Sequence, residues 1–400
     1  MTNKLYFLSI DIKGYPLFEQ NLNLSLLTEN RVSQDYAESL MPLFGSNYTN
    51  NITTIVGKNA TGKTMILKMT IGILSLLLGG KSIIETKLSE IFFDDSKVTF
   101  NTYFYGDDRF IFKDELIIEK DRVTNDLIIK SEKIYQKKAL ISDSKKKLLD
   151  FSKAKLIMDR NNLKPEVAAI LSTDDSIFRT IIKMNNYFIP VIADNTFFTN
   201  RNLFISDLGN VPSEILRYLD PSIEYLKIER ADIKGGKAFY RLKFKNGDKE
   251  ITDSNFATIE YYLSSGTAKG ISLYTQMLRV LQSGGIIFVD EIENHFNHAI
   301  ARTFINYFKD PAININNAKL IFTSHCAEFL DDLDRNDQIY LARRLHQISL
   351  TRYSSTKMRS DILRSDVFMS DSIHGTAPEY SAYLALKKAT TNHTMFNKLS

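Results

Sequence analysis

The sequence has little cysteine, no tryptophan and no long apolar run. Cys326 is its one cysteine, which excludes a disulfide framework and a cysteine-based zinc site and fits a reducing cytoplasm. Residues 1–7 lack the apolar run and the small-residue cleavage site of a signal peptide. The most apolar stretch, residues 71–78, is far shorter than the ~20 residues needed to span a bilayer. We therefore expect a soluble, cytoplasmic protein with no membrane partner.

The chain also lacks a strong excess of either charge. Lysine and arginine number 51 against 47 acidic residues, which gives a net charge of +4. Such a mild excess neither requires nor excludes a nucleic-acid partner. The 44% hydrophobic and 24% charged residues are typical of a globular protein, and 400 residues suffice for a large domain with an insertion.

Periodic apolar patterns predict a mixed α/β chain. Apolar residues crowd the stretch 64–78, which predicts a helix that ends at Gly79 and Gly80. A hairpin at 223–251 is expected to turn at residues 234–237 and near 246–248. Further alternating or continuous apolar runs predict strands at 4–12, 20–27 and 52–56 and a hairpin at 98–112.

Residues 129–220 differ, because their pattern favours helices and their first part is rich in lysine. We expect a mainly helical, lysine-rich insertion. It is either an arm that contacts DNA, RNA or an acidic protein, or the solvated face of inserted helices. The second interpretation is favoured, since neither interleaved arginines nor a readout motif accompany the lysines. The lysines are Lys130, Lys133, Lys137, Lys138, Lys145, Lys146, Lys147, Lys153 and Lys155.

A phosphate-binding motif follows the strand predicted at 52–56. Eight residues between that strand and the next helix match G-x-x-x-x-G-K-[ST] at every fixed position. Glycines let successive backbone N–H groups face one centre, and the helix N-terminus attracts the same anion. In such a Walker A loop Lys63 reaches the β- and γ-phosphates and the Thr64 hydroxyl binds Mg²⁺, so ATP and Mg²⁺ are the expected cofactors. The residues are Gly57, Lys58, Asn59, Ala60, Thr61, Gly62, Lys63 and Thr64.

Two carboxylates supply a second anchor for the metal. Asp290 and Glu291 follow the apolar run 286–289, which predicts a buried parallel strand. Ligands of such sheets bind beyond the carboxyl ends of the strands. We therefore interpret Asp290 as the Walker B ligand of Mg²⁺ and Glu291 as the general base that activates water.

A short polar segment lies between the two Walker motifs, with Gly266 placed 24 positions before Asp290. A Ser-Gly pair that opens a helix forms another anion site, although by itself it is only a good helix start. The segment resembles the ABC signature motif, with Thr267 where transporters usually carry glutamine. The resemblance implies that it caps the γ-phosphate bound to the opposite subunit of a dimer. Its residues are Ser264, Ser265, Gly266 and Thr267.

His325 ends another buried strand and is similar in place to the ABC switch histidine, which contacts the γ-phosphate. Its neighbour Cys326 is interpreted as a packed small side chain.

Residues 291–295 occupy the D-loop position, which runs along a dimer seam. His295 and His298 invite a metal interpretation, but no third ligand lies nearby in sequence, so a seam or surface role is favoured.

The order of these motifs, followed by the run 333–340, resembles the AAA-15 type ATPases, relatives of the OLD (overcoming lysogenization defect) family and, more distantly, of RecF and SMC heads. Three features depart from the group. The segment after the D-loop lacks the usual proline, we find no Q-loop glutamine, and too little chain follows His325 for a TOPRIM domain. The Asp-x-Asp pair at Asp332 and Asp334 lies in the ATPase segment, so we expect no nuclease site.

The resemblance implies an ABC-type ATPase head formed by residues 1–128 and 221–400, with 129–220 inserted between them. Members of the group commonly act in bacterial anti-phage defence, beside a separate effector such as a TOPRIM protein. A defence ATPase that controls such an effector is therefore our first hypothesis. The alternative is a DNA-repair head related to SMC and RecF that binds nucleic acid directly, and an ABC transporter subunit is less favoured.

Overall fold

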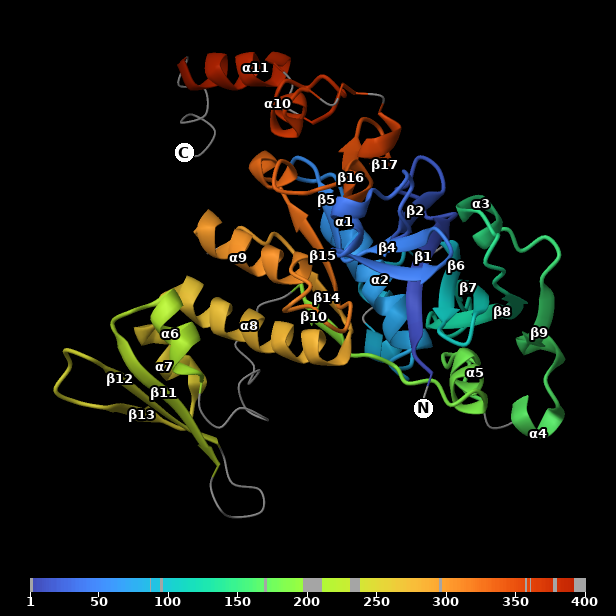
Figure 1. Ribbon diagram of the computed structural model, residues 1–400, viewed down its shortest axis with the longest axis horizontal. Helices are drawn as coiled ribbons and strands as arrows, with labels where there is room; N and C mark the ends of the chain where they lie inside the picture. The colour runs from blue at the N-terminus through green and yellow to red at the C-terminus, as the bar shows by residue number, and fades with distance from the viewer. Residues whose placement is uncertain are drawn as a thin grey trace.

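The computed structural model describes residues 3–86, 88–93, 96–168, 171–196, 211–230, 238–294, 297–356, 358–359, 361–376 and 380–391. Within these ranges the chain forms a mixed α/β protein built on two large sheets (Figure 1). The α/β P-loop fold predicted from the sequence is confirmed.

One sheet contains six strands among the described residues, in the order β10-β14-β15-β5-β16-β17. The strands from β10 to β16 run parallel, and β17 is antiparallel at the edge. The strand predicted at 52–56 is confirmed as β5. The bounds are β5 (Ile52–Val56), β10 (Ile192–Asn195), β14 (Ile286–Val289), β15 (Lys319–Ser324), β16 (Ile339–Arg344) and β17 (Ile348–Arg352).

Alternate side chains of the parallel strands enter two cores, as the two-residue period of a strand requires. Ile55 and Phe288 face the core that contains helix α2 (Lys63–Leu77). Val56 and Val289 face the core that contains α8 (Ser265–Ser283) and α9 (His298–Lys309). Burial on both faces explains why these strands read as continuous apolar runs.

Helix α2 lies between the two large sheets, and residues on all its sides are buried. A helix that is apolar all round is stable only in such a place. The helix predicted at 64–78 is thereby confirmed, shifted by one residue at each end.

The second large sheet is antiparallel, with six strands among the described residues in the order β2-β1-β6-β7-β8-β9. The two N-terminal strands and the hairpin predicted at 98–112 are confirmed as β1, β2, β6 and β7. The bounds are β1 (Leu5–Lys13), β2 (Leu22–Ser25), β6 (Lys97–Gly106), β7 (Phe110–Lys120), β8 (Leu127–Lys138) and β9 (Lys155–Asp159). A small β3 (Leu40–Phe44) and β4 (Asn47–Asn50) pair lies beside it.

A smaller unit precedes α8 in the chain and is seen at the lower left of Figure 1. Strands β11 and β12 form the hairpin predicted at 223–251, and the turn near 246–248 leads to β13. The turn expected at 234–237 lies outside the described residues. The elements are α6 (Ser213–Leu219), β11 (Ile223–Arg230), β12 (Ala238–Phe244), β13 (Ile251–Asp253) and α7 (Phe256–Tyr262).

The prediction of a mainly helical insertion at 129–220 is wrong. Most of β8 and all of β9 lie in this range and extend the antiparallel sheet, and β10 belongs to the parallel sheet. Leu127, Ile129, Glu132 and Ile134 of β8 are buried, with exposed or half-buried residues between them. A bulge at residues 129–131 interrupts this alternation and hides the strand period in the sequence. The short helices are α3 (Lys145–Leu148), α4 (Pro165–Ala168) and α5 (Phe178–Met184).

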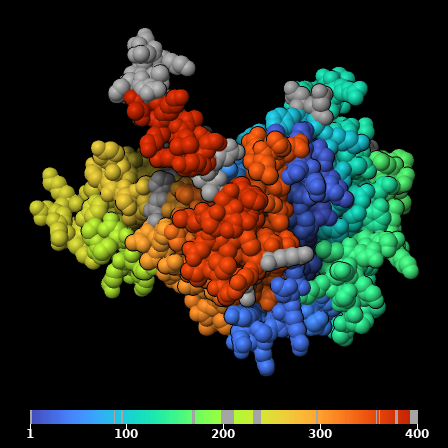
Figure 2. Space-filling view, turned by 90° about the horizontal axis from the view of Figure 1, so that it is seen from above, coloured from blue at the N-terminus to red at the C-terminus, as the bar shows by residue number. Residues whose placement is uncertain are grey.

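The C-terminal part ends in α10 (Arg364–Met369) and α11 (Tyr380–Thr391). Helix α11 has no buried residue and stands out from the rest of the molecule (Figures 1 and 2). No helix in the described part of the chain is both long and apolar enough to cross a membrane.

Candidate functional site

The order of the parallel strands brings the predicted motifs to one edge of the sheet. Strand β15 pairs with β5 on one side and with β14 on the other. Gly57, Asp290 and His325 each follow one of these strands directly. Because the strands are parallel, their carboxyl ends meet at this edge, where α/β proteins bind ligands.

The loop from Gly57 to Thr64 is shaped by its own backbone and by Lys63. The Lys63 ammonium donates hydrogen bonds to the carbonyl oxygens of Gly57 at 2.7 Å and Lys58 at 3.1 Å. Ala60 and Gly62 have φ values of 63° and 87°, in the left-handed region. A Cβ on Gly57 would lie 2.3 Å from the carbonyl oxygen of Ala342, so only glycine fits there.

Lys63 is held in a buried and acidic setting. Lys63 is only 5% exposed to solvent. Burial lowers the pKa of the ammonium, and the charges of Glu291, Asp290 and Glu293 act in the opposite direction. A phosphate group entering the loop would favour the charged lysine further, by placing an anion beside it.

The two residues predicted to hold Mg²⁺ contact each other. Thr64 Oγ1 donates a hydrogen bond of 2.7 Å to Asp290 Oδ2, and Thr323 Oγ1 donates to Asp290 Oδ1. Hydroxyl and carboxylate oxygens are the donors that Mg²⁺ prefers. The donor set therefore fits a magnesium ion, with Thr64 and Asp290 as its protein ligands.

Glu291 is positioned at this edge by its backbone conformation and by two hydrogen bonds. Its φ of 48° turns the chain sharply after β14, and its N–H donates to Thr323 Oγ1 at 2.8 Å. The Asn294 amide donates to the Glu291 carboxylate. A hollow of 110 Å³ lies next to it, lined in part by Asn195, Lys269, Asp290, Glu291 and Asn294. The carboxylate thus borders a space large enough to hold a water molecule.

His325 is held in place by Glu293, for which the motifs predicted no role beyond its place in the D-loop segment. Glu293 Oε1 accepts hydrogen bonds from the His325 backbone N–H at 2.6 Å and from His325 Nδ1 at 2.7 Å. Glu293 is buried, whereas the His325 ring is 43% exposed. Donation from Nδ1 leaves Nε2 available to a ligand.

The predicted signature opens helix α8. Ser264 caps this helix, and its hydroxyl accepts the N–H of Thr267 at 3.0 Å. Ser264 and Ser265 are exposed, and Gly266 is half-buried in the first turn. The first turn is therefore open to another molecule, and the trans role of these four residues stays a prediction. Of the predicted D-loop, His295 lies outside the described residues.

Comparison of the sequence with known protein families finds one match. The family model described as "AAA domain, putative AbiEii toxin, Type IV TA system" matches residues 52–331, which include the Walker A, signature, Walker B, D-loop and switch segments. The chain belongs to this family.

A solved structure, the SMC head domain from Thermotoga maritima, is similar to this AAA-domain chain at 10% identity, with a TM-score of 0.40 over 86% of this chain and 98% of that one. No curated protein matches the chain. The family confirms an AAA-type P-loop ATPase domain, while the closer link to the OLD group stays a prediction.

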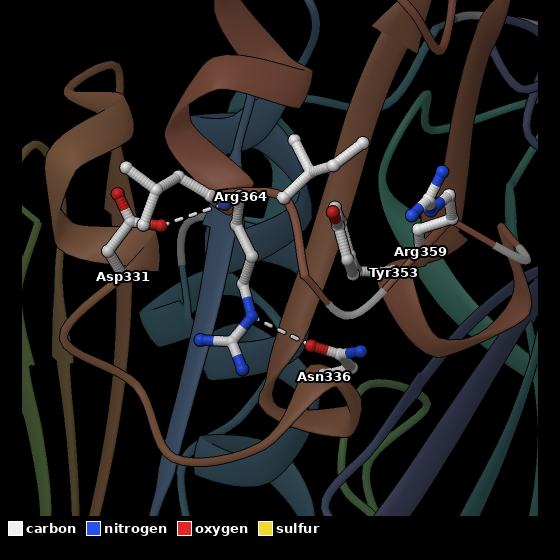
Figure 3. A pocket seen from close by; sticks show the side chains of 7 residues that line it. Asp331, Asn336, Tyr353, Arg359 and Arg364 are labelled. Atoms are coloured by element: carbon white, nitrogen blue, oxygen red, sulfur yellow. Dashed lines mark hydrogen bonds between the residues drawn. The ribbon is translucent and has the colours of Figure 1, made fainter.

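This AAA-domain protein has another hollow away from the nucleotide edge. It measures 190 Å³ and is lined by residues that include Asp331, Asn336, Tyr353, Arg359 and Arg364 (Figure 3). The Arg364 backbone N–H donates to Asp331 Oδ1, and its guanidinium donates to Asn336 Oδ1. These bonds tie α10 to the segment after β15. The polar residues that line the hollow therefore have a structural role.

Proposed function

We propose that this protein binds ATP with Mg²⁺ at residues 57–64 and hydrolyses it. The observation that carries the proposal is the contact between Thr64 and Asp290, which come from different motifs and meet beside Lys63. The P-loop N–H groups and Lys63 would hold the phosphates. Mg²⁺, when bound, would neutralise charge on the phosphate oxygens.

Glu291 is the proposed general base. It takes a proton from the attacking water, whose oxygen forms a bond to the γ-phosphorus. The bond between that phosphorus and the β–γ bridging oxygen breaks, giving ADP and phosphate. Asn294 orients the Glu291 carboxylate, and Glu293 orients His325, whose Nε2 donates to the γ-phosphate region when the ring is in its doubly protonated imidazolium form.

The site is proposed to be composite. The first turn of α8, with Ser265 and Gly266, closes the nucleotide bound to another copy of the chain. Ser264 and Ser265 are exposed and leave the first turn of α8 accessible to a second chain, which supports this proposal. ATP then acts as a clamp between subunits of a dimer.

The proposed biological role is the sensor or scaffold ATPase of an anti-phage defence system, which controls a separate effector, such as a TOPRIM nuclease. Membership in a family described with toxin–antitoxin proteins supports this role. Its test is phage challenge of cells carrying the chain and its genomic neighbour. Loss of resistance with Lys63→Ala, and with loss of the neighbour, is expected; resistance that survives both changes contradicts the role.

Direct binding of nucleic acid is the alternative, and the lysines of 130–155 weigh against it. Lys145 Nζ donates to the carbonyl oxygen of Asn30 at 2.7 Å, and Lys137 Nζ to that of Asp150 at 2.6 Å. Lys130 pairs with Glu119 at 3.1 Å. These contacts give the lysines structural partners. Salt-sensitive DNA binding that falls on mutation of Lys146 and Lys147, both exposed, would support the alternative instead.

A further inference from the structure

Four potential metal ligands lie beside the nucleotide edge, on the segments that follow β14 and β15; three of them form a mutually close group, and the fourth, His298, contacts one member of it, Cys326. The four are Glu293, His298, His325 and Cys326. We propose that these side chains form a binding site for a zinc-class divalent cation, separate from the Mg²⁺ ligands Thr64 and Asp290. This inference does not rest on ATP hydrolysis.

The spacing of the ligand atoms supports the site. One ligand atom from each of Glu293, His325 and Cys326 lies within 4.8 Å of the others. Cys326 Sγ lies 3.6 Å from His298 Nε2. Bonds of about 2.0–2.3 Å in a tetrahedral site place ligand atoms roughly 3.3–3.8 Å apart. The Cys326–His298 pair already has this separation, and a bound ion would have to replace the 2.7 Å contact between His325 Nδ1 and Glu293 Oε1.

An orphaned oxygen provides the second observation. Glu293 is 9% exposed, and its Oε2 atom is buried without a hydrogen-bond partner in the described part of the chain. A buried carboxylate oxygen without a donor is costly unless a cation or water meets it. Its other oxygen is held by His325. The partly exposed rings of His298 and His325 leave a path by which an ion can enter.

The types of donor decide which ion fits. Thiolate, imidazole and carboxylate together suit zinc, whereas the all-oxygen set at Thr64 and Asp290 suits magnesium. Burial and the charges of Glu293 and Glu328 raise the pKa of the Cys326 thiol to about 11. Binding of a cation by the thiol would release its proton into solvent.

The proposed site gives the single cysteine, Cys326, a role as a metal ligand in place of a packing role. A zinc site built on several cysteines is excluded by composition, but one thiol is enough when imidazoles and a carboxylate complete the shell. The predicted pairing of His295 with His298 lacked a third ligand. The fold supplies ligands for His298 from the segment after β15 instead.

Cobalt(II) provides the direct test, because its spectrum reports both geometry and thiolate ligation. The full chain is titrated with Co²⁺ in the absence of nucleotide. We expect saturation near one equivalent, intense tetrahedral bands and a thiolate-to-cobalt charge-transfer band, all removed by Zn²⁺. Cys326→Ser should lose the charge-transfer band, and His298→Ala should weaken binding by about tenfold or more.

Two controls separate this site from others. His346→Ala removes an exposed histidine elsewhere and should leave the titration unchanged. Asp290→Asn removes the Mg²⁺ ligand and should also leave the charge-transfer band intact. Absence of saturable cobalt binding would overturn the proposal. Binding without the thiolate band, or binding lost in Asp290→Asn, would overturn it equally.

Discussion

Thr64 Oγ1 donates a hydrogen bond of 2.7 Å to Asp290 Oδ2, across 226 positions of sequence. The bond joins the first turn of α2 to the end of β14, and β15 lies between β14 and β5 in the sheet. Thr323 at the end of β15 holds the other oxygen of Asp290. The fold therefore brings the proposed ligands of Mg²⁺ together.

Asp290→Asn tests this arrangement. The amide keeps the shape of the side chain but loses the charge that binds Mg²⁺. We expect Mg²⁺ to lose most of its ability to strengthen ATP binding, measured by calorimetry with and without the metal. Asp35→Asn, an exposed change on α1 (Gln34–Ala37), serves as the control. An unchanged magnesium dependence in Asp290→Asn would contradict the assignment.

Lys63→Ala removes the positive charge at the phosphates. We expect loss of nucleotide binding, because the Lys63 ammonium lies inside the phosphate loop, where it donates hydrogen bonds to the carbonyl oxygens of Gly57 and Lys58. Binding of a fluorescent ATP analogue measures this effect. The exposed Lys81→Ala should bind as the parent does. Equal affinity in parent and Lys63→Ala would mean that the P-loop is not the nucleotide site.

Glu291→Gln separates binding from turnover. The amide cannot accept the proton of the attacking water, so we expect turnover to fall by roughly 10²–10⁴ with ATP affinity retained. The variant should also accumulate as a nucleotide-bound dimer, seen by light scattering. Asn294→Ala, which frees the carboxylate without removing it, should reduce turnover less. Hydrolysis at the parent rate in Glu291→Gln would show that another group is the base.

Asp114 gives a prediction about stability and pH. It is fully buried on β7, where burial and neighbouring Glu132 raise the pKa of its carboxyl well above the usual value. The folded chain keeps this proton while the unfolded chain releases it, so this group's contribution to stability falls as pH rises above about 4.

Asp114→Asn removes that penalty, because the amide stays neutral at every pH. We expect its free energy of unfolding, relative to the parent, to improve as pH rises from about 5 to 8, measured by urea denaturation. Exposed Asp35→Asn should show no such trend. Parallel pH curves for parent and Asp114→Asn would show that Asp114 is ionised in the folded state.

Local patterns predicted the elements that hold the phosphate. The β-branched run at 52–56, the glycines at Gly57 and Gly62, and the apolar helix that follows each determine structure within a few residues. The same reasoning failed at β8. The buried acid Glu132 and a bulge break the period that a strand leaves in sequence.

Contacts between distant segments could not be predicted in the same way. Glu293 meets His325 because β14 and β15 are neighbours in the sheet, and Thr323 reaches Asp290 for the same reason. No spacing within one motif encodes that adjacency. The dimer and the effector also depend on contacts beyond one local pattern, and they stay predictions.

Mixing two inactive variants tests the composite site most directly. Lys63→Ala breaks the P-loop and Ser265→Arg blocks the first turn of α8, so each variant alone should fail to hydrolyse ATP. A mixed dimer pairs the intact P-loop of one chain with the intact α8 of the other. We predict that an equal mixture recovers about a quarter of the parent rate, from random pairing in a two-fold dimer. A mixture that stays inactive, or a Ser265→Arg chain that turns over ATP alone, would contradict the composite site.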